Sequence, residues 1–284
     1  MNAERIAKAL GGSGRARNGW WRCRCPVHQS LGPTLALRDG DRALLVKCHA
    51  GCPPGAVLAE LRRLGLFDGT YKPDPAAPNN EDRERNRAYA IKIWNEAKLA
   101  ERSPLLRRYL QSRGITLPIP RTLRWARSCK HTNRGYFSAM IARVDDVDGN
   151  HVAIHRTYLL ADGSGKVPFK PDRLSLAPVG GHAVRLAPAA PLMLVGEGIE
   201  TCLSAMQACG LPTWAALSNG GIENLILPDM VSEIIILADH DLNGAGQRSA
   251  HIAARRWRRE GRTARVALPP APGDFNDILQ GRAA

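Results

Sequence analysis

The feature that most constrains the fold is a pair of short apolar segments that both end abruptly in carboxylates. Leu192–Gly196 runs directly into Glu197, and 234–238 runs directly into Asp239 and then Asp241. Segments of this length that are apolar on both faces are typical of buried parallel strands. Open α/β sheets bind ligands at the carboxyl ends of such strands, so we expect the three carboxylates to converge. Carboxylates that converge need a cation between them, and the hard, oxygen-seeking choice is Mg²⁺ or Mn²⁺.

The C-terminal third alternates between strand-like and helix-like segments, which predicts a Rossmann-like parallel sheet over residues 190–284. Gly210 and Gly261 directly follow two of the helical segments and favour helix ends there. Asp274 and Asp277 follow the last predicted strand. The predicted strands are 192–196, 213–217, 233–238 and 265–268, and the predicted helices are 199–209 and 243–260.

The N-terminal region contains two clusters of soft metal ligands. Cys25 and His28 form the first cluster, and Cys48 and Cys52 form the second. Zinc prefers four tetrahedral nitrogen and sulfur ligands, and a predicted hairpin of 34–38 and 43–47 brings the two clusters together. We therefore expect a structural zinc ribbon over residues 1–67. Cys23 and His49 are spare candidates that we do not expect to bind the metal.

Two tryptophans, Trp20 and Trp21, precede the first cluster, next to Arg22 and Arg24. Aromatic rings beside arginines are suited to stacking on single-stranded nucleic acid. The alternative is that the two rings cover a very small core, and the sequence does not decide between these interpretations.

Charge and hydropathy limit the partners and the compartment. The 284 residues carry a formal net charge of +14, most of it from arginine, and this favours an anionic partner. No apolar run reaches 18 residues and the N-terminus has no signal-peptide core, so we expect a cytoplasmic protein without a membrane span. The seven cysteines are then metal ligands or core thiols rather than disulfides.

A proline-rich segment of mixed charge at 68–86 predicts a linker, and an α+β region at 87–189 follows it. Helices are expected at 87–102 and 104–113. Strands are expected at 136–144 and 151–160, joined by the turn 145–150, with 166–171 and 173–176 extending the sheet.

Several basic side chains lie along this predicted sheet. Because alternate residues of a strand share one face, we expect a basic face turned toward the acids, where it would bind nucleotide or template phosphates. A solvated strand surface is the alternative. The segment 163–166 (GSGK) is not a Walker loop, because Leu160 and Val167 stand where that pattern needs Gly and Ser or Thr. The expected basic residues are Arg143, His155, Arg156, Lys166, Lys170 and Arg173.

Glu197 after one strand, with Asp239 and Asp241 after another, resembles the TOPRIM domain. The site at Cys25, His28, Cys48 and Cys52 resembles the zinc-binding domain of bacterial-type DNA primases, particularly phage- and plasmid-borne forms. The order of the two domains strengthens this resemblance, which covers most of residues 20–280. The resemblance implies Mg²⁺ or Mn²⁺ held by Glu197, Asp239 and Asp241, and Zn²⁺ held by the Cys/His set. Asp274 and Asp277 resemble a later acidic motif of the family, which makes them further candidate catalytic acids. Replicative primases have two residues between the last pair of zinc ligands rather than three, so His49 remains an alternative to Cys52.

The resemblance implies synthesis of RNA primers on single-stranded DNA from NTPs by two-metal nucleotidyl transfer. A separate replicative helicase is a candidate partner. Alternatives are a TOPRIM nuclease, which shares the acids, and a non-catalytic zinc/TOPRIM DNA-binding factor. A topoisomerase would need a nucleophilic tyrosine in a second large domain, and the five tyrosines at 71, 89, 109, 136 and 158 have no such domain around them.

Overall fold

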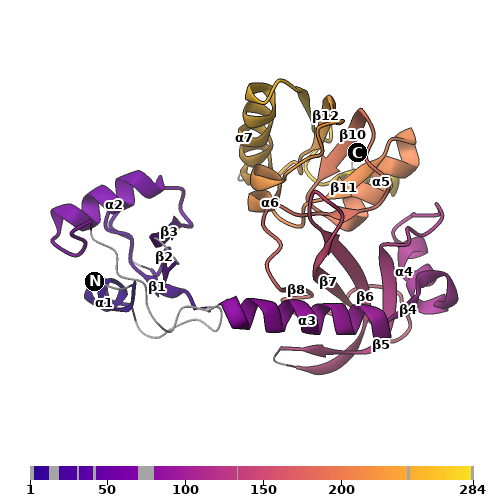
Figure 1. The fold of residues 1–284 in the computed structure, drawn as a ribbon, viewed down its shortest axis with the longest axis horizontal. Helices are drawn as coiled ribbons and strands as arrows, with labels where there is room; N and C mark the ends of the chain where they lie inside the picture. The colour runs from indigo at the N-terminus through magenta and orange to yellow at the C-terminus, as the bar shows by residue number, and fades with distance from the viewer. Residues whose placement is uncertain are drawn as a thin grey trace. The chain divides into compact units, whose positions relative to one another are not determined.

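The computed structural model describes residues 3–12, 19–30, 32–40, 43–69, 80–132, 134–241 and 244–282. The chain divides into two compact units, Met1–Asp82 and Arg83–Ala284 (Figure 1). Most of the predicted linker, residues 70–79, lies outside the described residues. The last part of the predicted linker, residues 80–86, is helical, because a helix begins at Asn80. None of the helices in the described ranges is long and apolar enough to cross a lipid bilayer.

The N-terminal unit is a small antiparallel sheet with two helices. The predicted hairpin is present, with Leu35 opposite Cys48 and Asp39 opposite Leu44. A strand that we did not predict extends the sheet, and its Cys23 lies opposite Leu35. Both helices and the sheet share one small core, which includes Ile6, Leu37 and Leu61. The elements are α1 (Ala3–Ala9), β1 (Trp21–Cys23), β2 (Leu35–Asp39), β3 (Leu44–Cys48) and α2 (Pro54–Arg63).

The second unit begins with an antiparallel sheet in the order β4-β5-β6-β7-β8. The predicted hairpin forms its centre, whereas β5 was not predicted. The helix predicted at 87–102 begins earlier, at Asn80, and also ends earlier, at Glu96, because Lys98–Leu99 pairs with β5 instead. Ser103 caps the next helix by accepting a hydrogen bond from Leu106 N at 3.1 Å. The elements are α3 (Asn80–Glu96), β4 (Lys98–Leu99), the 3₁₀ helix η1 (Ala100–Arg102), α4 (Pro104–Ser112), β5 (Leu123–His131), β6 (Gly135–Asp145), β7 (His151–Leu159) and β8 (Arg173–Leu176).

The two faces of this sheet pack against different partners. Ala139, Ile141 and Ile154 contact Trp94 of α3 in one hydrophobic cluster. Met140, Ala142 and other residues of the opposite face share a second cluster with α4 and with the C-terminal domain. Because side chains alternate along the strands, one face of the sheet packs against α3 and the other packs against the region that contains the acids.

The C-terminal domain is an α/β sheet in the order β13-β12-β10-β11-β9. Four strands are parallel, as predicted, and only the short β9 pairs antiparallel. The whole chain is therefore a mixed α/β protein with an N-terminal Cys/His cluster and a C-terminal parallel sheet. The elements are β9 (Val184–Arg185), β10 (Leu192–Gly196), α5 (Ile199–Cys209), β11 (Thr213–Ala215), α6 (Asn219–Asn224), β12 (Glu233–Leu237), α7 (Ala245–Arg259), β13 (Thr263–Ala267) and α8 (Phe275–Leu279).

Candidate functional site

The ends of β10 and β12 bring the predicted acids to one edge of the parallel sheet. The two strands are neighbours, with Gly196 opposite Leu237, so Glu197 and Asp239 emerge at the same level. Gly196 also lies close to α5, since a Cβ there would be 2.8 Å from Cys202 Sγ. We refer to Glu197, Asp239 and Asp241 as the acid edge.

The residues of the acid edge interact electrostatically. Burial, together with the charges of Glu197, Asp274 and Asp241, raises the pKa of Asp239 to about 7, although Arg173 opposes them. Burial also raises the pKa of Glu197, with Arg173 lowering it and Asp241 raising it. These carboxylates therefore resist ionising together unless a cation neutralises them.

One further observation fits a divalent cation at the acid edge. Asp239 Oδ1 is buried and has no hydrogen-bond donor among the residues that the structure describes. A buried carboxylate oxygen without a donor is unfavourable in protein, and Mg²⁺ and Mn²⁺ prefer such hard oxygen ligands. Asp241 Oδ2 accepts a hydrogen bond from Gly246 N at 3.1 Å, in the first turn of α7. Within the described ranges the carboxylates do not form a closed set with all ligand atoms within 4.8 Å of one another, as the cysteines and histidine of the N-terminal unit do.

Asp274 and Asp277 have different roles in the structure. Together they form a capping box at the start of α8. Asp274 accepts from Asp277 N at 3.0 Å, and Asp277 accepts from Asp274 N at 3.1 Å. Of these two acids, Asp274 is the one whose charge contributes to the raised pKa of Asp239. The structure therefore brings Asp274 to the acid edge and uses Asp277 to hold the helix that carries it.

Of the predicted basic residues, Arg173 acts on the acid edge, and His155 lies beside Arg173. Arg173 on β8 lowers the pKa of both Glu197 and Asp239. His155 on β7 is buried next to Arg173, and its Nδ1 lies 2.9 Å from Ser175 Oγ. Burial and the nearby Arg173 lower the pKa of His155 to about 4, so this side chain is neutral at physiological pH.

The expectation of one shared basic face is wrong for Arg143 and Arg156. His155 and Arg156 are consecutive on β7, so their side chains point to opposite faces. Arg156 lies on the α3 side with Tyr158, and it donates to the backbone oxygens of Lys130, Leu174 and Ser175. Arg143 pairs with Asp145 at 2.6 Å. Lys170 is largely exposed and pairs with Asp172 at 2.8 Å.

Glu200 is an important residue that sequence reasoning did not assign. It lies in the first turn of α5, three residues after Glu197, and is only 4% exposed. Tyr109 of α4 donates a hydrogen bond to Glu200 Oε1 at 2.5 Å, and Lys166 Nζ lies 3.0 Å from the same oxygen. Burial favours the neutral acid, but Lys166 and Tyr109 outweigh it and hold the pKa of Glu200 well below its usual range. The sequence feature that indicates this residue is a second acid, three residues after Glu197, in the first turn of a predicted helix.

The N-terminal unit brings Cys25, His28, Cys48 and Cys52 together. One ligand atom from each lies within 4.8 Å of all the others. His28 Nδ1 faces the thiols, at 3.1 Å from Cys52 Sγ, and its Nε2 lies 3.2 Å from Thr34 Oγ1. A hydrogen bond to the outer nitrogen is the usual way in which a metal-binding histidine is oriented. The donor set and its spacing fit a structural zinc ion.

The spare candidates of the N-terminal unit lie outside this cluster. Cys23 is a buried core residue on β1, and His49 is exposed. Cys52, rather than His49, is therefore the fourth member. Trp20 and Trp21 are both half-buried. Arg38 lies over the Trp20 ring at 5.1 Å, and Trp21 packs against the core.

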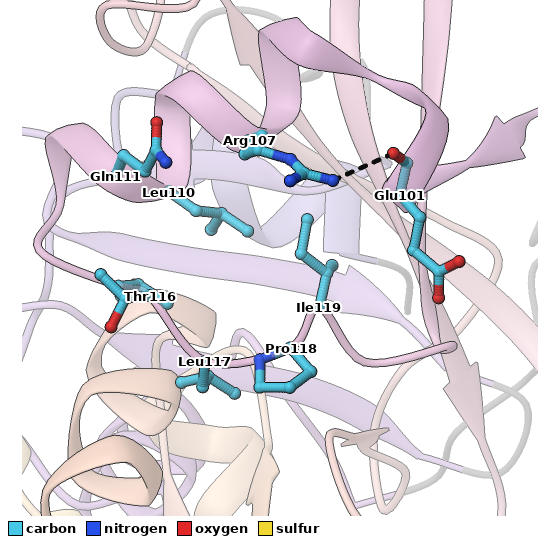
Figure 2. A pocket seen from close by; sticks show the side chains of 9 residues that line it. Glu101, Arg107, Leu110, Gln111, Thr116, Leu117, Pro118 and Ile119 are labelled. Atoms are coloured by element: carbon cyan, nitrogen blue, oxygen red, sulfur yellow. Dashed lines mark hydrogen bonds between the residues drawn. The ribbon is translucent and has the colours of Figure 1, made fainter.

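A separate pocket lies between α4 and the segment that follows it (Figure 2). Its volume is about 360 Å³. Arg107 donates to the backbone oxygen of Glu101 across it, at 3.3 Å. Neither the acid edge nor any of the basic residues predicted from the sequence lines this pocket, so it is not part of the candidate site.

Comparison with protein families identifies the domain that carries the acid edge. Residues 192–284 match the Toprim domain, which spans the parallel sheet and all five predicted acids. The C-terminal part of the chain is thus a Toprim domain. Residues 84–186 match a domain of unknown function (DUF7146). A search of curated proteins found no match.

Several solved DNA primases are similar to this chain. A primase domain from Pseudomonas aeruginosa is 18% identical with a TM-score of 0.48, over 70% of this chain and 75% of that one. The zinc-binding and RNA polymerase domains of Aquifex aeolicus primase are 13% identical with a TM-score of 0.46, over 98% and 80%. The primase fragment of the bacteriophage T7 primase-helicase protein is 15% identical with a TM-score of 0.41, over 92% and 95%.

Proposed function

We propose that the protein is a DNA primase that synthesises short RNA primers on single-stranded DNA for replication of a phage, plasmid or other mobile element. The observation that carries the proposal is the acid edge on a Toprim domain. The Oδ1 atom of Asp239 there is buried without a hydrogen-bond donor among the described residues, and the carboxylate is repelled by Glu197, Asp241 and Asp274. The Cys/His cluster of the N-terminal unit, in the order typical of primases, supports this function over that of a bare Toprim nuclease.

The proposed chemistry is nucleotidyl transfer, in which the protein mainly positions groups and balances charge. Bound Mg²⁺ or Mn²⁺ would activate the 3′-hydroxyl and stabilise the leaving pyrophosphate. Glu197, Asp239 and Asp241 would hold the metal, with Asp274 adding charge beside Asp239. Because these acids repel one another when they are ionised, a bound cation would stabilise their ionised forms.

Arg173 and Lys166 are the cations that we assign to the nucleotide triphosphate. Arg173 lowers the pKa of two acids of the edge, Glu197 and Asp239. It would therefore also neutralise the negative charge of a triphosphate bound there. Lys166 is 24% exposed at its side chain although it is paired with Glu200, so part of it faces solvent. Neutral His155 would contribute a hydrogen bond rather than a charge.

The N-terminal unit would hold the template single strand. Zinc would stabilise a unit whose hydrophobic core is small, since structural zinc binding is coupled to folding in such domains. Trp20 and Trp21 remain our candidates for contacts with bases. The proposed activity also implies a cytoplasmic location, a supply of NTPs and a separate replicative helicase as a partner.

The test is incubation of the purified chain with single-stranded DNA, NTPs and Mg²⁺, with the products separated on a gel. Labelled RNA of a few nucleotides supports the primase. A shortened template without new RNA would replace the proposal with a Toprim nuclease. Template that is bound but neither copied nor cut would replace it with a non-catalytic DNA-binding factor.

A further inference from the structure

A second pocket, of about 390 Å³, lies where the C-terminal half of α3 meets the ends of β5 and β6. It falls entirely within residues 84–186, the part that matches a domain of unknown function. None of the acid edge and none of the basic residues predicted from the sequence lines it. The lining residues that matter here are Tyr89, Lys92, Lys98, Arg127, Lys130 and Tyr136.

The pocket lies at an open edge of the middle sheet. The short β4 pairs only with Arg124 and Trp125, so in the described sheet no strand pairs with β5 on that side beyond Trp125. The register of β5 against β6 also shifts between Ala126 and Cys129. Such a bulge re-aims side chains and is common at sheet edges beside binding sites. Arg127 lies within this bulge and lines the pocket.

The charge of the lining is strongly positive. Four exposed cations line the pocket, and the only carboxylate among the lining residues is Glu96. Glu96 lies 3.9 Å from Lys92, which is a weak, exposed pair. Across the described part of the chain, no carboxylate pairs with Lys98, Arg127 or Lys130. The pocket therefore presents unneutralised positive charge to an anionic ligand.

Two exposed aromatic rings accompany these cations. Tyr136 is 65% exposed and Tyr89 is 48% exposed. Charged residues alone would protect an edge strand from aggregation, but exposed rings have the opposite effect, so protection does not account for the whole set. Aromatic faces among cations are the combination that binds single-stranded nucleic acid, because bases stack on the rings while phosphates meet the cations.

We propose that this pocket is a contact site for single-stranded DNA, separate from the acid edge. Tyr136 and Tyr89 stack on bases, and Lys98, Arg127 and Lys130 neutralise the phosphates between them. Stacking on exposed rings needs unstacked bases, which a single strand presents, so a single strand fits better than duplex DNA. The proposal rests on the proposed function only in taking DNA, the primase template, as the nucleic acid.

Binding is tested with the full chain and a fluorescently labelled oligodeoxythymidine by anisotropy, without Mg²⁺ or NTPs. Tyr136→Ser should weaken binding at least about fivefold, the lower end of the loss of one base–ring stack. Tyr136→Phe keeps the ring and should bind as the wild type does. The double variant Lys98→Gln/Lys130→Gln should also lower the slope of log affinity against log salt by roughly 1.4, at about 0.7 for each phosphate contact.

Two matched controls separate a site from a general effect of charge. Lys98→Arg/Lys130→Arg keeps both charges and should keep the salt slope. Arg265→Gln removes a charge from β13, where Arg265 pairs with Glu233 at 2.8 Å, and should leave binding unchanged. Equal losses in Arg265→Gln and in the pocket variants would overturn the proposal, as would equal affinity for duplex and single-stranded DNA.

Photo-crosslinking to an oligonucleotide that contains 4-thiothymidine locates the contact independently of activity. Crosslinked peptides that contain Tyr136 or Tyr89 support the site even if the chain makes no primers, so the failure of the proposed function would remain distinguishable. Crosslinks confined to other peptides, with wild-type binding by Tyr136→Ser, would overturn the inference.

Discussion

Lys166 and Glu200 form an ion pair at 3.0 Å that joins the middle sheet region to the first turn of α5. Glu200 is nearly fully buried, and Tyr109 of α4 donates to the same carboxylate oxygen. Three segments that are distant in the sequence therefore meet one helical turn behind Glu197. We infer that this contact fixes the position of the acid edge relative to the basic residues that face it.

Replacing Glu200 with Gln should destabilise the protein by roughly 2–4 kcal/mol. Breaking a fully buried ion pair costs about 3–5 kcal/mol, and the Lys166 side chain retains some solvent. Urea denaturation measures the change. The matched control is Glu233→Gln, which removes the exposed pair with Arg265 and should cost less than about 1 kcal/mol. Equal effects of the two variants would show that the Lys166–Glu200 contact is unimportant.

The same pair gives a pH dependence with a defined sign. The pKa of Glu200 is depressed in the folded protein, so its stabilising effect is present above the ordinary carboxyl pKa of 4.5 and is lost as the pH falls toward the folded-state value. The stability difference between wild type and Glu200→Gln should therefore be constant from neutral pH down to about pH 5 and shrink below it. A difference that grows on acidification would contradict this assignment.

Zinc content tests the N-terminal cluster. We expect one Zn²⁺ per chain by elemental analysis, because one ligand atom from each of four residues lies within 4.8 Å of the others. Cys25→Ser/Cys48→Ser should lose the metal, whereas His49→Ala should retain it. Zinc-free wild-type protein, or loss of zinc in His49→Ala alone, would refute the ligand set.

The sequence predicted the bounds of an element correctly where its hydrophobic pattern is regular and its ends are marked. Leu192–Gly196 and Ile199–Cys209 have the predicted bounds, because an apolar run and a glycine mark their ends. The strand β5 was missed because Leu123–His131 carries five polar or charged residues and gains its order by pairing with β6. Such pairing is a tertiary effect that the segment itself does not encode.

The candidate site shows the same division. Three carboxylates that directly follow apolar strands were predictable, because parallel strands end at one edge. The separation of His155 from Arg156 follows from alternation alone and was available from the sequence. The contact of Glu200 with Tyr109 and Lys166 was not, because it depends on how α4 and α5 pack.

Thermal unfolding with and without Mg²⁺ tests the metal site without any activity. Mg²⁺ at ten times its Kd should stabilise the folded protein by about 1.4 kcal/mol, or a Tm increase of roughly 3–6 °C. Asp239→Asn should lose this response. Without Mg²⁺ it should be more stable than wild type at pH 8, because the raised pKa of Asp239 means that ionisation opposes folding as the pH rises through about 7. Mg²⁺ stabilisation of Asp239→Asn equal to that of wild type would exclude Asp239 as a ligand.

The two acids of α8 should differ in their effects. Asp277→Ala removes half of a capping box and should cost about 0.5–2 kcal/mol of stability, with little effect on Mg²⁺ binding. Asp274→Asn keeps a capping side chain but removes a charge beside Asp239, so it should weaken Mg²⁺ binding with a smaller loss of stability. The measurements are urea denaturation and the Mg²⁺-dependent Tm. The reverse pattern would contradict the division of roles between them.

The most direct test of the central claim is ribonucleotide incorporation on single-stranded DNA by wild type and Asp239→Asn at matched concentration. The buried Oδ1 of Asp239 has no hydrogen-bond partner in the described part of the chain, so we expect primers from the wild type and none from the variant, with the far-UV circular dichroism unchanged. Primer synthesis by Asp239→Asn at the wild-type rate would contradict the assignment of the acid edge as the catalytic metal site.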